Sequence, residues 1–154
     1  MEASLKIYTD GGCSGNPGPG GWAYVIVQLS FQGENVIAEK LGAEKNTTNN
    51  RMELSAVIES LRALKTMNAP RQIAVYTDSQ YVQKGITEWI HGWKRNSWRT
   101  SDKKPVKNQD LWVELDSIAG EFVINWQWVR GHAGNKYNER CDRMTQEAIA
   151  SIRN

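Results

Sequence analysis

The chain has 154 residues, of which 40% are hydrophobic and 23% charged, and its mean hydropathy is −0.60. This is the size and composition of one ordinary globular domain, so we expect a single domain over residues 1–154. No stretch approaches the ~18 apolar residues of a membrane span. The first residues run directly into a strand pattern without a signal peptide, which predicts a cytoplasmic protein. Nothing in the pattern suggests an oligomeric seam or an obligatory protein partner, and we expect a monomer.

Cysteine and histidine are too few for the common structural zinc sites. Cys13 and Cys141 are far apart in the chain, and His91 and His132 are the two histidines. These numbers and spacings match no zinc-binding pattern. A disulfide between the two cysteines stays open, although free thiols are the expectation for a reducing compartment.

The net charge of +2 is unevenly distributed. Residues 89–109 contain six Lys or Arg and one Asp, a net +5, so the rest of the chain carries −3. Lys94 and Arg95 stand between tryptophans at 89, 93 and 98. Cations that neutralise phosphates, next to rings that pack on sugars or bases, are typical of nucleic-acid binding. A helix with buried tryptophans and solvated charges explains the same pattern, and both interpretations can hold together.

The predicted elements alternate in type along the chain. In order, we expect a strand at 5–10, a Gly- and Pro-rich loop at 11–21, a hairpin with strands at 22–31 and 35–41, a helix at about 50–67, a strand at 72–78, helices near 79–89 and 110–119, a strand at 122–129 and a helix at about 137–152. A hairpin followed by strands that alternate with helices predicts an α/β fold, in which helices cover a mixed sheet.

Two of the predicted strands end in the same tripeptide, Tyr-Thr-Asp, at Asp10 and Asp78. If these strands are parallel neighbours, both carboxylates project at one sheet edge, where open α/β sheets bind ligands. Neighbouring carboxylates repel each other, so a divalent cation is their natural partner. A turn at Asp10 and a helix N-cap at Asp78 would explain each residue singly, whereas the duplicated context favours a site.

Three further residues have both a structural and a functional interpretation. Glu53, three residues after Asn50, is spaced as a capping-box carboxylate or serves as a third metal ligand. Asp142, in the first half of the last helix, is a solvated carboxylate or another ligand. His132 lies in a glycine-flanked loop after a strand, which suits a mobile group that handles protons.

Six blocks of the sequence resemble, in order, those of bacterial type 1 ribonuclease H. They are YTDG at 8–11, GNPGPGG at 15–21, TTNNRMEL at 47–54, TDSQYV at 77–82, WVRGHAG at 128–134 and NERCD at 138–142. The likeness covers about residues 5–150, essentially the whole chain. It implies a ribonuclease H-like fold with a five-stranded mixed sheet flanked by helices. The implied activity is endonucleolytic hydrolysis of the RNA strand of an RNA–DNA hybrid, leaving 5′-phosphate and 3′-hydroxyl ends.

The resemblance also implies a metal site and its mechanism. Four carboxylates would bind two Mg²⁺ ions, with Mn²⁺ as a substitute: Asp10, Glu53, Asp78 and Asp142. Two ions about 4 Å apart would deprotonate a water on one side and stabilise the leaving 3′ oxygen on the other. His132 would assist metal exchange or product departure.

Contacts with both strands of the hybrid follow from the same resemblance. The RNA strand and its 2′-hydroxyls, which distinguish RNA from DNA, would be lined by Cys13, Asn16, Asn49, Asn50 and Gln80. On the DNA strand, Thr48 and Asn108 would hold a phosphate and Trp89 would pack against a sugar. Lys94 and Arg95 would belong to a basic protrusion at about 89–109 that grips the hybrid.

One position departs from the family pattern. Asn46 stands where many members carry Arg in the DNA-phosphate pocket, with Lys45 beside it as a compensating charge. This predicts weaker or more salt-sensitive binding of the DNA strand. A non-catalytic hybrid-binding module is the alternative function. The four intact carboxylates argue against it, because a pure binder gains nothing from negative charge where phosphate must lie.

Overall fold

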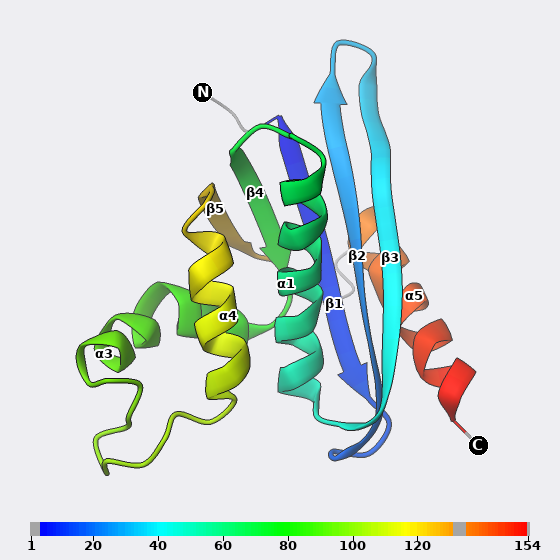
Figure 1. The fold of residues 1–154 in the computed structure, drawn as a ribbon. Helices are drawn as coiled ribbons and strands as arrows, with labels where there is room; N and C mark the ends of the chain where they lie inside the picture. Colours follow the sequence, from blue (N-terminus) through cyan, green and yellow to red (C-terminus); the bar gives the residue numbers. More distant parts are fainter. Residues whose placement is uncertain (1–3, 131–134, 154) are drawn as a thin grey trace.

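The computed structural model describes residues 4–130 and 135–153 and confirms the predicted mixed α/β sheet, with helices on both faces (Figure 1). The strands are β1 (Leu5–Cys13), β2 (Gly18–Ser30), β3 (Gly33–Thr47), β4 (Gln72–Thr77) and β5 (Val123–Trp128). The helices are α1 (Asn49–Thr66), α2 (Gln80–Lys84), the π-helical turn η1 (Gly85–Trp89), α3 (Ile90–Arg95), α4 (Gln109–Ala119) and α5 (Lys136–Ile152). Within the described ranges, no helix combines the length and the apolar character needed to cross a membrane.

The strand order is β3-β2-β1-β4-β5, so β1 lies in the middle of the sheet. It pairs antiparallel with β2 and parallel with β4, and β4 pairs parallel with β5. The expectation that the two Tyr-Thr-Asp strands are parallel neighbours is confirmed, since Tyr8 is in register with Tyr76. Asp10 and Asp78 each follow this pair by two residues and therefore lie at the same level of the sheet.

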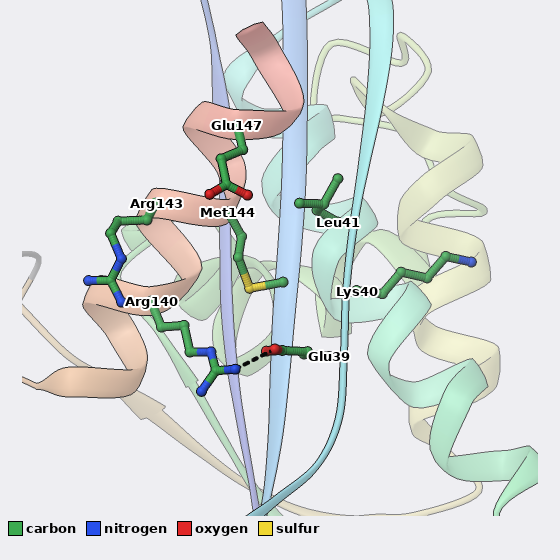
Figure 2. Close-up of a pocket in the computed structure, with 7 residues that line it drawn as sticks. All are labelled: Glu39, Lys40, Leu41, Arg140, Arg143, Met144 and Glu147. Carbon is green, nitrogen blue, oxygen red and sulfur yellow. Dashed lines mark hydrogen bonds and ion pairs between the residues drawn. The ribbon is translucent and has the colours of Figure 1, made fainter. Parts of the chain in front are cut away.

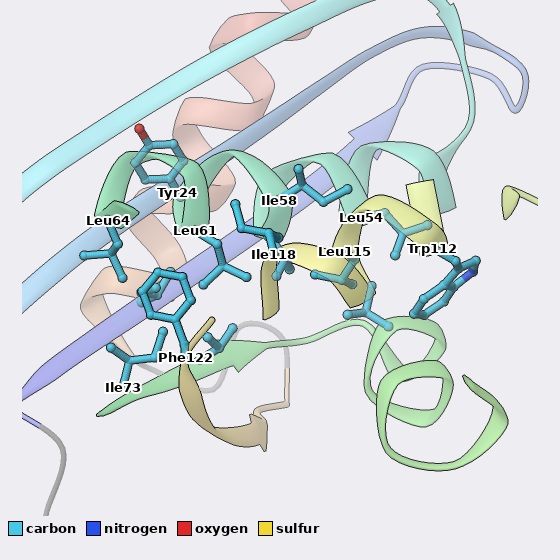
Figure 3. Close-up of a cluster of buried hydrophobic side chains, with 14 of the residues drawn as sticks. Tyr24, Leu54, Ile58, Leu61, Leu64, Ile73, Trp112, Leu115, Ile118 and Phe122 are labelled. Atoms are coloured by element: carbon cyan, nitrogen blue, oxygen red, sulfur yellow. The ribbon is translucent and has the colours of Figure 1, made fainter. Parts of the chain in front are cut away.

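Helix α1 covers one face of the sheet with the predicted apolar stripe. All five predicted residues are buried: Leu54, Val57, Ile58, Leu61 and Leu64. They pack with Trp112, Leu115 and Ile118 of α4 and with apolar residues of the central strands (Figure 3). Burying a side chain of this size contributes about 1.5–3 kcal/mol relative to leaving it exposed. This core therefore fixes α1 against β1.

The start of α1 differs from the capping-box interpretation. Thr48 is the N-cap, and its Oγ1 accepts a hydrogen bond from the Arg51 backbone N–H. Glu53 is the fifth residue of the helix, so it lies beyond the first turn and caps nothing. The structural explanation for Glu53 is thus wrong, and its side chain is free to face the sheet.

Helix α5 covers the other face of the sheet, over β1, β2 and β3 (Figure 1). The side chain of Asn135 caps its N-terminus by accepting hydrogen bonds from the backbone N–H groups of Tyr137 and Asn138. Cys141 is fully buried, and its thiol donates to the carbonyl oxygen of Tyr8. Both cysteines are free thiols, so the expected reduced state agrees with the structure.

The predicted loop at 11–21 is wrong over most of its length. Strand β1 continues to Cys13 and β2 begins at Gly18, with Gly12 paired opposite Gly21. A Cβ on Gly21 would lie 2.9 Å from the backbone oxygen of Thr145 in α5, so the glycine permits close packing. Asp10 consequently lies inside β1, three residues before its end. The glycines here serve helix–sheet packing and do not form an irregular loop.

Candidate metal centre and nucleic-acid interface

Three carboxylates from separate elements meet at one edge of the sheet. Asp10 projects from β1, Glu53 from α1 and Asp78 from the residue after β4. One oxygen from each lies within 4.8 Å of the others. Gly11 permits this meeting, because a Cβ at that position would lie 2.5 Å from the Glu53 backbone nitrogen. The sequence-predicted group of Asp10, Glu53 and Asp78 is therefore brought together.

Burial and mutual repulsion make this group costly to ionise. Burial, and then the neighbouring charge of Asp78, raise the pKa of Asp10 to about 7. Burial, followed by the charges of Asp10 and Asp78, raises the pKa of Glu53 well above its ordinary value. Glu53 Oε1 is buried without a hydrogen-bond partner among the described residues. A bound cation would favour the charged forms, and oxygen ligands of this kind suit hard cations such as Mg²⁺.

The two remaining predicted catalytic residues are Asp142 and His132. Asp142 is half-buried on α5 and does not belong to the compact group that the described carboxylates form. Its charge nevertheless raises the pKa of Asp10, which places it nearby. His132 lies at 131–134, outside the described residues, and its predicted role stays a prediction.

Asp78 is held by contacts that the sequence did not suggest. The indole Nε1–H of Trp128 donates to the Asp78 carbonyl oxygen over 3.1 Å, which links β5 to the end of β4. Ser79, and not Asp78, is the N-cap of α2, because the Ser79 hydroxyl accepts from the Val82 N–H. Of the Asp78-Ser79 pair it is therefore the second residue that caps α2, and Asp78 is not the N-cap.

The residues predicted to line the RNA strand lie around the starts of β2, α1 and α2. Asn16 Oδ1 accepts from the Asn49 backbone N–H over 3.1 Å, which joins the β1–β2 turn to the first residue of α1. The Cys13 thiol is half-buried and donates to the carbonyl oxygens of Gly18 and Thr47. Asn49 and Gln80 are exposed and Asn50 is half-buried, so their amides are accessible from solvent.

The residues predicted to hold a DNA phosphate are joined through Arg51. Its guanidinium forms a two-point ion pair with Asp110, with N–O distances of 3.0 and 2.7 Å, and also donates to Asn108 Oδ1. Asn108 has a left-handed backbone (φ 61°), and its amide donates to the Tyr81 hydroxyl. Since the Arg51 N–H binds Thr48, one residue links both predicted phosphate ligands. Sequence reasoning missed Arg51, because the partners of its guanidinium lie 57 and 59 positions away in the chain.

The basic segment at 89–109 packs part of its aromatic side chains against the body of the protein, as the structural interpretation expected, and nucleic-acid binding by its cations stays a prediction. Trp112 is fully buried, and Trp93 packs on it edge to face with ring centroids 5.3 Å apart. These rings anchor the segment to the body. Trp89 is 40% exposed, and Arg95 is exposed. Lys94 Nζ lies 3.3 Å from Asp116, so part of its charge is already compensated.

A surface pocket of about 560 Å³ lies elsewhere, between β3 and α5 (Figure 2). It is lined by Glu39, Lys40, Leu41, Arg140, Arg143, Met144 and Glu147. Arg140 and Glu39 form an ion pair across it. None of the sequence-predicted site residues lines this pocket, so the two sites are separate.

The fold and the carboxylate group define an α/β protein with a candidate metal centre, and similarity to known proteins identifies its family. The family model for RNase H matches residues 2–150. The chain belongs to the ribonuclease H family. It is 53% identical over 160 residues to a Ribonuclease H from the bacterium Treponema denticola, covering 97% of this chain and 99% of that protein.

Solved structures agree with this placement. LC9-RNase H1, described as a type 1 RNase H with the type 2 active-site motif, superposes with a TM-score of 0.87 at 30% identity. The match covers 99% of this chain and 74% of that one. LC11-RNase H1, solved in complex with an RNA/DNA hybrid, gives a TM-score of 0.71 at 26% identity over 96% of this chain and 97% of that one. The predicted ribonuclease H-like fold is thereby confirmed.

Proposed function

We propose that this protein is a metal-dependent endonuclease that hydrolyses the RNA strand of RNA–DNA hybrids and leaves 5′-phosphate and 3′-hydroxyl ends. The observation that carries the proposal is the meeting of Asp10, Glu53 and Asp78 oxygens within 4.8 Å in a chain of the ribonuclease H family. The hybrid bound to LC11-RNase H1 supports the choice of substrate.

The carboxylates would hold two Mg²⁺ ions, or Mn²⁺ in their place, with Asp142 as the fourth ligand. The residues fit this role, because they offer only oxygen ligands and include a buried Glu53 Oε1 that has no hydrogen-bond partner in the described part of the chain. When bound, the ions supply Lewis-acid stabilisation of the phosphate and an activated water. The chain itself fixes the ligands: β1 and β4 set Asp10 and Asp78 at one level, and α1 brings Glu53 across Gly11. A covalent protein nucleophile is not required.

The two strands of the hybrid would meet different parts of the surface. Amides and backbone groups around the β1–β2 turn and the starts of α1 and α2 would read RNA 2′-hydroxyls. The pair of Thr48 and Asn108, joined by Arg51, would take a DNA phosphate beside the exposed Trp89. Lys94 and Arg95, in the basic protrusion at about 89–109, would contact the backbone. We propose that the single domain acts as a monomer without an obligatory protein partner.

A gel assay tests the substrate and the reaction. End-labelled RNA–DNA hybrid, double-stranded RNA and double-stranded DNA are incubated with Mg²⁺ or with EDTA. We expect cleavage of the RNA strand of the hybrid, and only with metal. A hybrid that is bound but left intact with both Mg²⁺ and Mn²⁺ would favour the non-catalytic binding module.

Asp10→Asn tests the site itself. The substitution removes negative charge from the metal ligands but leaves the residues proposed to contact phosphate in place. Cleavage should therefore be abolished while hybrid binding is largely kept, as measured by the same gel assay and by a filter-binding titration. Substantial Mg²⁺-dependent cleavage by this variant would contradict the assignment of the carboxylate group.

A further inference from the structure

Thr145 carries a buried hydroxyl that helix α5 does not use. The residue lies on the inner face of α5, three positions after Asp142, and is fully buried. A threonine in the middle of a helix commonly donates its hydroxyl to the carbonyl four residues earlier. Thr145 does not do so, and its Oγ1 forms no hydrogen bond with any described part of the chain. Valine would fill the same volume without this unpaired group, so the hydroxyl calls for an explanation.

The surroundings of Thr145 place its side chain against β1, the strand that carries Asp10. Its methyl carbon Cγ2 lies 3.6 Å from where a Cβ on Gly12 would be, two residues after Asp10 on β1. Gly12 and Asp10 are two residues apart on β1, so their side-chain positions lie on the same face of the strand, where α5 packs. Thr145 is thus a neutral donor packed against the strand that carries Asp10, on the side of α5.

We propose that Thr145 is a positioning residue for Asp10. Its hydroxyl donates to one oxygen of the Asp10 carboxylate and leaves the other directed at Glu53 and Asp78, where a metal ion binds. A carboxylate oxygen is a strong hydrogen-bond acceptor, so it offers the Thr145 hydroxyl the partner that α5 does not supply. Groups that orient metal ligands in this way typically affect metal affinity. The inference rests on the proposed function of the carboxylate group.

The test compares three variants by Mg²⁺ titration calorimetry in the absence of nucleic acid. Thr145→Val removes the hydroxyl and keeps the shape, whereas Thr145→Ser keeps the hydroxyl and removes the methyl. Ser60→Ala is the control, because Ser60 is a fully buried helix residue whose hydroxyl donates to Val57 within α1. We expect Thr145→Val to weaken Mg²⁺ binding by about tenfold. Thr145→Ser and Ser60→Ala should bind Mg²⁺ as the parent does.

Cleavage kinetics give a second readout. At limiting Mg²⁺, Thr145→Val should lower kcat without changing KM for the hybrid, because the hybrid contacts are untouched. Equal Mg²⁺ affinity in parent and Thr145→Val would overturn the proposal, and so would an equal loss in Thr145→Ser, which would point to packing by the methyl. If Thr145→Val does not fold by circular dichroism, Thr145→Ala against Thr145→Ser makes the same comparison. If the parent protein cleaves the hybrid with Mg²⁺, the proposed function stands whatever the Thr145 variants show. If the parent protein binds no Mg²⁺, both the proposed function and the proposed role of Thr145 are contradicted.

Discussion

Gly11 lies next to Asp10 on β1 and faces the backbone of α1 at Glu53. A Cβ at this position would lie 2.5 Å from the Glu53 nitrogen and 2.6 Å from the Met52 oxygen. The first distance is 0.9 Å short of the 3.4 Å at which ordinary contact begins. Both atoms are backbone and cannot rotate away. Gly11→Ala must therefore move α1 and β1 apart by an amount comparable to this 0.9 Å shortfall, and Glu53 moves with α1.

The consequence can be estimated for both activity and stability. A displacement of about 1 Å in a catalytic group can cost ~10²-fold in rate. Overpacking of a close contact destabilises a protein by about 1–3 kcal/mol, and in a chain of this length each kcal/mol lowers Tm by about 2–4 °C. We expect Gly11→Ala to lose about two orders of magnitude in kcat on hybrid, with weaker Mg²⁺ binding and a lower Tm.

Gly120→Ala is the matched control. Gly120 ends α4 with an ordinary φ of −64°, and a Cβ there would meet its nearest atoms at 3.5 Å. The substitution should leave activity unchanged and raise stability by a few tenths of a kcal/mol to about 1 kcal/mol. Steady-state cleavage, Mg²⁺ titration and thermal melts of the three proteins complete the experiment. Parent-like kcat and Tm in Gly11→Ala would refute the claim that this contact sets the position of Glu53.

Three other predictions concern charge and proton transfer. Because the pKa of Asp10 is raised from 3.8 to about 7, the folded protein binds more protons than the unfolded chain between these values, so its free energy of unfolding falls as pH rises through that range. Thermal melts in EDTA should show this decline, Asp10→Asn should reduce it, and a rise in Tm would contradict the sign. Asn46→Arg should tighten hybrid binding and, because an added phosphate contact steepens the salt dependence of log K by about 0.9, the Asn46 parent should differ by weaker binding and not by greater salt sensitivity; an unchanged slope would count against a phosphate contact there. His132→Ala should slow turnover without abolishing it, whereas unchanged turnover would leave that residue without a catalytic role.

The sequence predicted correctly those features that follow from helix periodicity and from a repeated tripeptide. The apolar stripe of α1 and the duplicated Tyr-Thr-Asp tripeptide both gave correct structural predictions, because helix period and strand pairing depend on local sequence. The Asp10–Asp78 pair followed from the repeated tripeptide once β1 and β4 were expected to be parallel neighbours, whereas the assignment of Glu53 to the group rested on the resemblance to ribonuclease H. Glu53 was ambiguous in the sequence, because a capping residue and a metal ligand occupy similar positions at the start of a helix.

The errors arose where tertiary packing overrides local composition. Gly11, Gly12 and Gly21 predict a loop by composition, yet they lie in β1 and β2. At Gly11 and Gly21, α1 and α5 approach the sheet too closely for a side chain. The link between Trp128 and Asp78 and the ion pair of Arg51 with Asp110 join residues 50 and 59 positions apart. No local pattern encodes such pairs, so they could be found only in the folded chain.

The position of β1 in the sheet separates the molecule into parts with different freedom of motion. Asp10 lies on the central strand, with β2 and β4 on its sides and α1 and α5 above and below. Backbone amides in such a strand exchange with solvent only when much of the protein opens, while peripheral segments exchange through local fluctuations. Residues 89–109 lie outside the sheet. Hydrogen exchange should therefore be slowest beside the carboxylates and faster in the basic segment, which can adjust to the shape of a duplex without disturbing the metal ligands.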